Sequence, residues 1–192
     1  MKHTLKVLNY LLLAGAMTFA SCGENKSETT ETTDSTATTD QMGTDSTQAG
    51  ADNNADQNFV NDATELNMKE MAWLKAGVAL GTDKEVKAHA KHMLADHEKT
   101  GMQMKELAGK KSMQLPTVDT AGEVSMNDEK GKDWDKKWAD KMVDDHEKTI
   151  SRFESAQNEV KDAELKDMIS KTLPTLRSHL EMAKKLKDRL DK

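Results

Sequence analysis

The sequence predicts an all-α fold, a four-helix bundle that follows a signal peptide and a disordered tether. Through residues 56–192, apolar residues recur at alternating steps of three and four, which is the spacing of a buried helix face. Strand-like alternation is absent from the same range. Pro and Gly residues gather in one long break, residues 112–132, which leaves two helices on each side. A range of this length suits one domain with one core.

Residues 1–21 have the layout of a lipoprotein signal peptide. A basic start at Lys2 and Lys6 precedes an apolar run that is too short for a membrane span of about 20 residues. The run ends in Phe19-Ala-Ser-Cys22, which resembles a bacterial lipobox. The resemblance implies cleavage before Cys22 and acylation of its thiol, and two or three acyl chains anchor a protein stably. Because Cys22 is the only cysteine, no intrachain disulfide and no cysteine-based metal site can form.

Residues 22–55 begin with that cysteine and continue as a polar tether. The segment is rich in Thr, Ser, Asp and Gln and has no aromatic residue, so it cannot bury enough apolar surface to offset the entropy of ordering. Acidic residues dominate its charge, and their repulsion extends it. We therefore expect the domain of residues 56–192 to work near a membrane at the end of a flexible segment.

The charge in residues 56–192 is nearly balanced, and both signs are mixed along the chain. There is no basic patch and no run of aromatic residues on basic sequence, which argues against a nucleic-acid partner. No Gly-rich phosphate loop and no nucleophile–His–acid set is present. The composition leaves the membrane, through the lipid anchor, and an envelope protein as the expected partners, and it does not indicate an enzyme.

A tight turn is expected between the first two helices. Asp56 can cap the first helix, which runs to about Leu80. Gly81 ends that helix, and Thr82-x-x-Glu85 has the pattern of a capping box that starts the second.

The second pair of helices follows residues 112–132. The third helix starts near Asp133 and the fourth near Asp162. Pro174 lies inside the fourth helix, where it cannot donate to the carbonyl four residues earlier, so we expect a kink. The break before the third helix is long enough to run the length of the bundle, which is the ferritin-like connectivity. An up-down-up-down bundle with a loose loop is the alternative.

A short motif occurs twice on the predicted buried faces. Met93-Leu-Ala-Asp96-His97-Glu-Lys-Thr100 recurs as Met142-Val-Asp-Asp145-His146-Glu-Lys-Thr149, so the second and third helices each carry a histidine at mid-length. A rise of about 1.5 Å per residue, counted from each turn, puts Glu70 near the height of His97 and His179 near the height of His146. His97 and His146 match in height because both lie at mid-helix. One core layer is therefore expected to hold Glu70, His97, His146 and His179, with Met93, Asp96, Met142 and Asp145 around it.

Three interpretations of this layer are open. It can be a buried polar layer, in which the histidines hydrogen-bond to one another and to acids and fix the register of the helices. It can bind a metal ion, because three imidazoles and a carboxylate suit Zn²⁺ or Cu²⁺, and thioethers favour Cu⁺. A di-iron enzyme is the third, but its Glu-x-x-His pairs are missing, since Leu94, Val143 and Leu176 stand three residues before the histidines.

Several motifs resemble a known family. Asp96-His97, Asp145-His146-Glu-Lys and Lys171-Thr-Leu-Pro-Thr-Leu-Arg-Ser-His179 are similar to motifs of bacterial exported proteins catalogued as domain of unknown function 4142 and often labelled predicted outer membrane protein. The resemblance covers residues 57–188 and implies a ferritin-like bundle without a settled activity. His89 departs from the pattern, where an aromatic or aliphatic residue is expected.

These observations predict an outer-membrane lipoprotein of the cell envelope, facing the periplasm or the cell surface. The expected role is that of a non-enzymatic interaction or stress-related module. Binding or sequestration of zinc or copper at the histidine layer is the alternative function.

Overall fold

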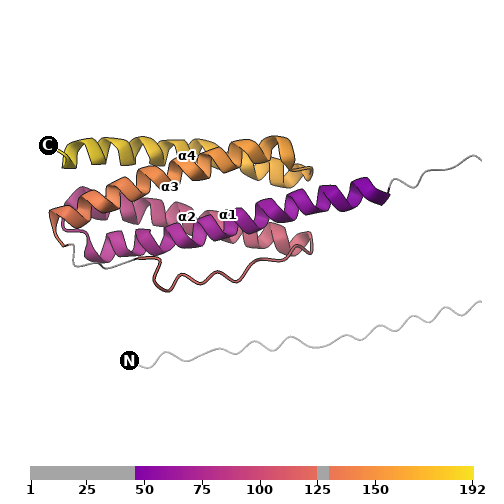
Figure 1. The fold of residues 1–192 in the computed structure, drawn as a ribbon, viewed down its shortest axis with the longest axis horizontal. Coiled ribbons are helices and arrows are strands. Elements are labelled where there is room, and N and C mark those ends of the chain that lie inside the picture. The colour runs from indigo at the N-terminus through magenta and orange to yellow at the C-terminus, as the bar shows by residue number, and fades with distance from the viewer. Residues whose placement is uncertain (1–45, 125–129) are drawn as a thin grey trace, which may run out of the picture. The chain divides into compact units, whose positions relative to one another are not determined.

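The computed structural model describes residues 46–124 and 130–192 of the 192-residue chain. The predicted signal peptide, Cys22 and most of the predicted tether lie outside these residues. Four α-helices make up the described part: α1 (Ser46–Leu80), α2 (Lys84–Lys110), α3 (Lys132–Glu159) and α4 (Ala163–Leu190). The predicted all-α four-helix bundle is confirmed (Figure 1). None of the helices in residues 46–124 and 130–192 is long and apolar enough to cross a bilayer.

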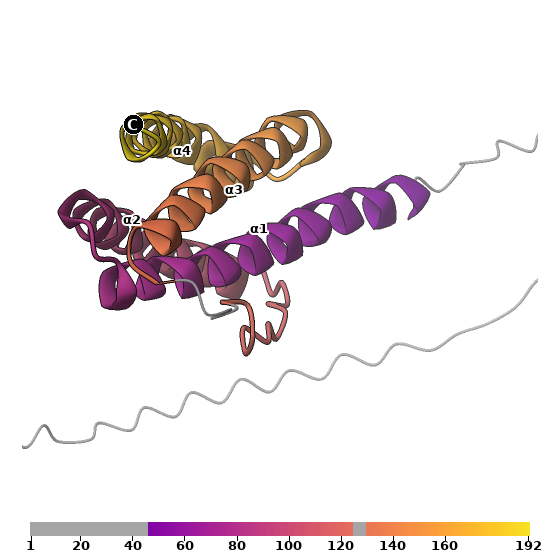
Figure 2. The ribbon, with the colours of Figure 1, turned by 60° about the vertical axis from the view of Figure 1, so that its left-hand side comes forward.

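Two antiparallel hairpins build the bundle. Figure 2 shows α1 beside α2 and α3 beside α4. Further packing joins α1 to α3 and α2 to α4, whereas α2 and α3 barely meet and so lie on a diagonal. The first turn of α3 is bound to the α1–α2 turn, and α1 near Asp56 is bound to the α3–α4 turn. Consequently α2 ends at the opposite end of the bundle from the start of α3, and the link between them runs the length of the bundle. The predicted ferritin-like connectivity is therefore confirmed.

A buried aspartate ties each hairpin to the turn of the other. Asp135, in the first turn of α3, accepts hydrogen bonds from the backbone N–H groups of Thr82 at 2.9 Å and Asp83 at 2.8 Å, and from the Thr82 hydroxyl. Asp56, in α1, accepts from the backbone N–H groups of Lys161 at 2.7 Å and Asp162 at 3.1 Å. Backbone donors at helix ends have no partner within the helix, so these carboxylates satisfy both turns.

The start of α1 differs from the prediction. The helix begins at Ser46, inside the range predicted as tether, and Asp56 lies within it instead of capping it. No proline interrupts the preceding residues, so a helix that is fixed by packing further along can extend backwards through them. Asp56 is buried, and its carboxylate accepts a hydrogen bond from the backbone of the α3–α4 turn.

The other ends are close to the predicted ones, with one change in the capping residue. The N-cap of α2 is Asp83, whose carboxylate accepts from the backbone N–H groups of Glu85 and Val86. Thr82 is not the cap, because its hydroxyl donates to Asp135 instead. α4 continues through Pro174 as one helix.

The apolar core consists of two clusters separated by the level of the histidines. The first apolar cluster lies toward the α3–α4 turn and includes Phe59, Val60, Met104, Phe153, Leu165 and Leu176. The second apolar cluster lies toward the α1–α2 turn and includes Trp73, Leu74, Met93, Trp138, Met142 and Leu186. The fully buried Trp138 donates its indole N–H to the carbonyl oxygen of Trp73 at 2.9 Å, which brings α3 close to α1.

Gly77 makes this close approach possible, which gives a testable prediction. A Cβ atom on Gly77 would stand 2.6 Å from Trp138 Nε1 and 2.7 Å from Ala90 Cβ. We expect Gly77→Ala to destabilise the protein by about 1–3 kcal/mol, since a packed core does not absorb an added carbon. The free energy of unfolding from urea denaturation measures the effect.

Gly109→Ala is the matched control. Gly109 is also helical, and a Cβ atom there meets nothing within 4 Å. This variant should be more stable than the wild type by about 0.5–1 kcal/mol, because alanine loses less entropy in a helix. Equal effects of the two substitutions would mean that α1 and α3 do not approach this closely.

Candidate metal centre

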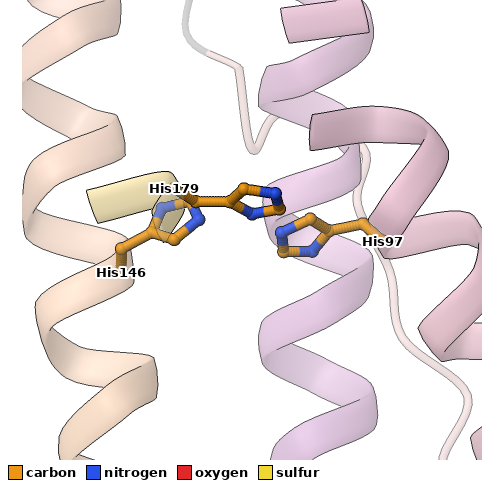
Figure 3. A group of neighbouring side chains, drawn as sticks. All are labelled: His97, His146 and His179. Carbon is orange, nitrogen blue, oxygen red and sulfur yellow. The ribbon is translucent and has the colours of Figure 1, made fainter. Parts of the chain in front are cut away.

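One ionisable side chain from each helix meets in the middle of the bundle. Glu70 comes from α1, His97 from α2, His146 from α3 and His179 from α4, and none is more than 4% exposed. Figure 3 shows the three imidazole rings turned toward one another between the helices. The centroids of the rings are 5.3–5.7 Å apart. The structure thus brings together the four residues that the sequence placed in one layer.

The outer nitrogen of each ring faces a hydrogen-bond acceptor. His97 Nδ1 lies 3.0 Å from Asn67 Oδ1, and His146 Nδ1 lies 2.9 Å from the carbonyl oxygen of Met142. His179 Nε2 lies 3.0 Å from Asp96 Oδ2. Because oxygen acceptors of this kind cannot donate, each outer nitrogen carries the ring proton.

The orientation of the Asn67 amide supports this assignment for His97. Its Nδ2 group donates to the carbonyl oxygen of His97 at 3.3 Å and to Met71 Sδ at 3.5 Å. Both partners are acceptors, so the amide oxygen is the atom that faces His97 Nδ1.

The inner nitrogens of the three rings converge on one point between the helices. His97 Nε2, His146 Nε2 and His179 Nδ1 lie within 4.8 Å of one another. All three atoms are buried and have no hydrogen-bond partner among the described residues. Nitrogen atoms around a tetrahedral zinc ion are about 3.3 Å apart for bond lengths near 2.05 Å. Small rotations of the rings would therefore close the three nitrogens on one ion.

Glu70 lies on the opposite side of the His146 and His97 rings from these inner nitrogens. Its Oε1 atom is 2.8 Å from His146 Nδ1, and its Oε2 atom is 3.9 Å from His97 Nδ1. Oε1 is an ion-pair partner of His146 without a hydrogen bond, because the Nδ1–H of His146 points to the Met142 carbonyl. The carboxylate therefore supplies a negative charge behind two of the rings, and it is not among the converging ligand atoms.

The pKa values show which groups are charged near neutral pH. Burial lowers the pKa of His97, and burial together with the nearby His146 lowers the pKa of His179 to about 4. Burial acts in the same direction on His146, but the Glu70 carboxylate, the Met142 carbonyl and Asp145 together outweigh it and raise the pKa of His146. Burial alone would raise the pKa of Glu70, but His146 and the other histidines lower it. Glu70 is therefore ionised, and two of the three imidazoles are neutral and able to bind a metal ion.

The residues expected around the layer have separate roles. Asp96 orients His179, as above, and also lies 3.7 Å from His92, so His92, Asp96 and His179 form a second, half-exposed group of possible ligands. Met142 contributes its backbone carbonyl and not its thioether. Met93 packs in the second apolar cluster.

Asp145 is not in contact with the histidine rings. Asp145 forms an ion pair with Lys141 at 2.6 Å, and burial raises its pKa.

Asn67 orients His97 but was not among the predicted site residues. The sequence holds one signal for this role, because Asn67 is a polar residue on a predicted buried face, one helical turn before Glu70.

Comparisons with known proteins bear on the family and the fold. The family model described as Domain of unknown function (DUF4142) matches residues 41–186. Among solved structures, the chain is similar to a conserved hypothetical protein, rv2844, from Mycobacterium tuberculosis, with a TM-score of 0.58 and 14% identity over 69% of this chain and 95% of that chain. Likeness at this identity shows the fold alone. No curated protein matched the sequence.

The depressed pKa of His179 predicts part of the acid sensitivity of the metal-free protein. The unfolded chain binds a proton at His179 near its ordinary pKa of 6.5, whereas the folded chain does so only near 4. Stability is therefore lost as the pH falls from about 6.5 toward 4. We expect His179→Gln to lose less stability over this interval, as measured by urea midpoints at several pH values.

Two comparisons make this measurement specific. His92→Gln removes an exposed histidine from α2 and should keep the wild-type pH dependence. The contribution of His146 has the opposite sign, because its pKa is raised: it is present below about 6.5 and is lost as the pH rises through the folded value. A His179→Gln protein with the wild-type pH dependence would mean that this imidazole is not buried.

Proposed function

The chain belongs to the DUF4142 family, and we propose that this member binds one divalent transition-metal ion through His97, His146 and His179 in the middle of its bundle. The observation that carries the proposal is the arrangement of the ring nitrogens. Each outer nitrogen has an acceptor, and each inner nitrogen is buried without a partner. Acceptors that hold the proton on the outer ring nitrogen in this way are typical of histidines that ligate metals.

A layer that served only to fix the register of the helices would be built differently. Buried polar atoms in proteins are normally paired, because an unpaired one costs roughly 1–3 kcal/mol. Here the inner nitrogens of three rings face one another without a hydrogen-bond partner, and a proton on His146 could serve only one of the other two rings. A cation is the partner that satisfies all three at once.

The charge of the layer also suits a cation. Glu70 is an ionised carboxylate at 2% exposure, and a buried charge needs an opposite charge nearby. Without a metal ion, a proton on His146 fills this role, which is why the pKa of His146 is raised. An ion at the inner nitrogens would replace that proton, so metal and proton compete for the site.

The donor set favours zinc or copper over harder ions. Three neutral imidazoles and no carboxylate among the converging atoms suit these metals, whereas Mg²⁺ and Ca²⁺ prefer oxygen. The proposed function is binding or sequestration of such an ion, and it requires no reaction at the centre.

The place of action in this proposal is the cell envelope. Phe19-Ala-Ser-Cys22 supports lipid attachment at Cys22, and the polar residues that follow would let the bundle sit away from the membrane. An envelope protein that receives or delivers the ion is the partner that such a role calls for.

Metal binding can be measured on protein purified without a histidine tag. One equivalent of Zn²⁺, Co²⁺ or Cu²⁺ should raise the melting temperature, since a ligand that binds only the folded state stabilises it, by about 2.7 kcal/mol at a hundredfold excess over Kd. The gain should fade as the pH falls below about 6, where protons compete. Stoichiometry is read by metal analysis after dialysis.

Two variants separate the buried centre from the surface. His146→Gln should lose the stoichiometric ion and the gain in melting temperature, because it removes one of the three converging nitrogens. His92→Gln should keep both, since His92 belongs to the half-exposed group. If wild-type protein takes up no ion, or if His146→Gln takes it up unchanged, the layer is structural and this proposal is wrong.

The anchoring proposal has its own test. Cys22→Ser should abolish incorporation of labelled palmitate and release the protein from the membrane fraction, because it removes the thiol that would be acylated. Ser21→Ala changes a neighbouring residue and should keep both properties. Continued labelling of the Cys22→Ser protein would show that the lipobox resemblance is misleading.

A further inference from the structure

A second group of possible metal ligands lies where α2 packs against α4. His92 and Asp96 are four residues apart on α2, so their side chains project from the same face of the helix. His179 of α4 lies beside them, with the centre of its ring 5.8 Å from that of His92. Each of the three side chains offers a ligand atom within 4.8 Å of the other two. The group thus combines two imidazoles with one carboxylate.

The spacing of these atoms is close to the spacing of ligands around one ion. Asp96 Oδ2 lies 3.0 Å from His179 Nε2 and 3.7 Å from His92 Nε2. Ligand atoms around a tetrahedral zinc ion are about 3.3 Å apart for bond lengths near 2.05 Å. The two distances lie on either side of this value, so a small rotation of the His92 ring would place all three groups around one ion. Two imidazoles and a carboxylate suit Zn²⁺ or Cu²⁺.

This group is open to solvent, whereas the proposed buried centre is not. The side chain of His92 is 60% exposed and that of Asp96 is 37% exposed, but His179 is buried. Asp96 also lines a cavity of about 460 Å³ whose wall includes His97 and His179. An ion held by His92 and Asp96 would therefore have water on one side and two ligands of the proposed centre on the other.

His179 belongs to both groups and offers a different nitrogen to each. Its Nδ1 atom is the inner one, and its Nε2 atom faces Asp96. A neutral imidazole carries its proton on one nitrogen and binds a metal ion through the other. When Nε2 binds an ion, the ring proton lies on Nδ1, and when Nδ1 binds it, the proton lies on Nε2 beside Asp96. One neutral ring therefore serves one of the two sites at a time.

We propose that His92, Asp96 and His179 form a surface site that captures a Zn²⁺ or Cu²⁺ ion from solvent and passes it through His179 to the buried centre. The capture site stands on its own three residues, whereas the inward transfer rests on the proposed function. Because two of its ligands are exposed to water, the surface site holds the ion more weakly than the buried centre and releases it during dialysis.

The capture site can be measured in protein that lacks the buried centre. Calorimetric titration of the His146→Gln protein with Zn²⁺ should show one weak site, and the His97→Gln protein serves the same purpose if His146→Gln fails to fold. Adding His92→Gln or Asp96→Asn should weaken this binding about tenfold or more, because even a group that only orients a metal ligand contributes about ten- to a hundredfold in affinity. Adding His89→Gln, one turn earlier on α2 and outside the group, should leave it unchanged.

Transfer is measured as a rate in protein that keeps the buried centre. His92→Gln should slow the uptake of Zn²⁺, followed by stopped flow with a coloured zinc indicator, and should slow its release to a chelator by the same factor. The dissociation constant of the buried centre should stay the same, because a group on the path changes the barrier for both directions and not the end states. His89→Gln should keep both rates.

Each result decides one part of the proposal. If protein without the buried centre binds no Zn²⁺, or binds it equally well after His92→Gln and Asp96→Asn, the group is an ordinary surface ion pair and the capture site is overturned. If the capture site is present but His92→Gln changes neither rate, the ion enters elsewhere and the transfer is overturned. If the wild type retains no ion after dialysis, the buried centre and the transfer are both wrong, and the titration alone decides whether the surface site exists.

Discussion

The middle of this bundle is organised by one buried negative charge. Glu70 cannot be ionised in an apolar core without a cation beside it, and the His146 ring, 2.8 Å away, is the group that the fold places there. The other two rings pack against His146 and are kept neutral by burial. The layer is thus one electrostatic unit, in which a proton on His146 and the proposed metal ion would be alternative ways to balance the same carboxylate.

The ends of the bundle repeat one design. Asp135 follows Asp56 along the chain at the same interval as Asp162 follows Asp83. Asp56 and Asp135 each bind the turn of the other hairpin, and Asp83 and Asp162 each cap the helix that follows such a turn. The basic ends of α2 and α4 complete the likeness, with Lys111 near Asp162 and Arg189 near Asp83. The two hairpins therefore resemble each other, and their mutual fastening sets the heights at which the buried side chains meet.

The sequence predicted what depends on periodicity and failed where side-chain direction decides. Spacing located four helices, and the rise per residue put Glu70 and three histidines at one level, since both depend on backbone geometry alone. It could not show that Glu70 faces the outer nitrogens, or that a backbone carbonyl and not a thioether of Met142 serves His146. Asn67 was not predicted, because the sequence does not show which group a buried amide side chain hydrogen-bonds to.

The long link between α2 and α3 supplies none of the residues of the histidine layer. Each hairpin has its own tight turn and contributes two of the four ionisable side chains. The layer therefore lies at the interface between the α1–α2 hairpin and the α3–α4 hairpin, and an ion bound there would join the two hairpins as a crosslink does. Binding of the proposed ion would therefore depend on how the two hairpins associate, because each hairpin supplies two of the four ionisable side chains.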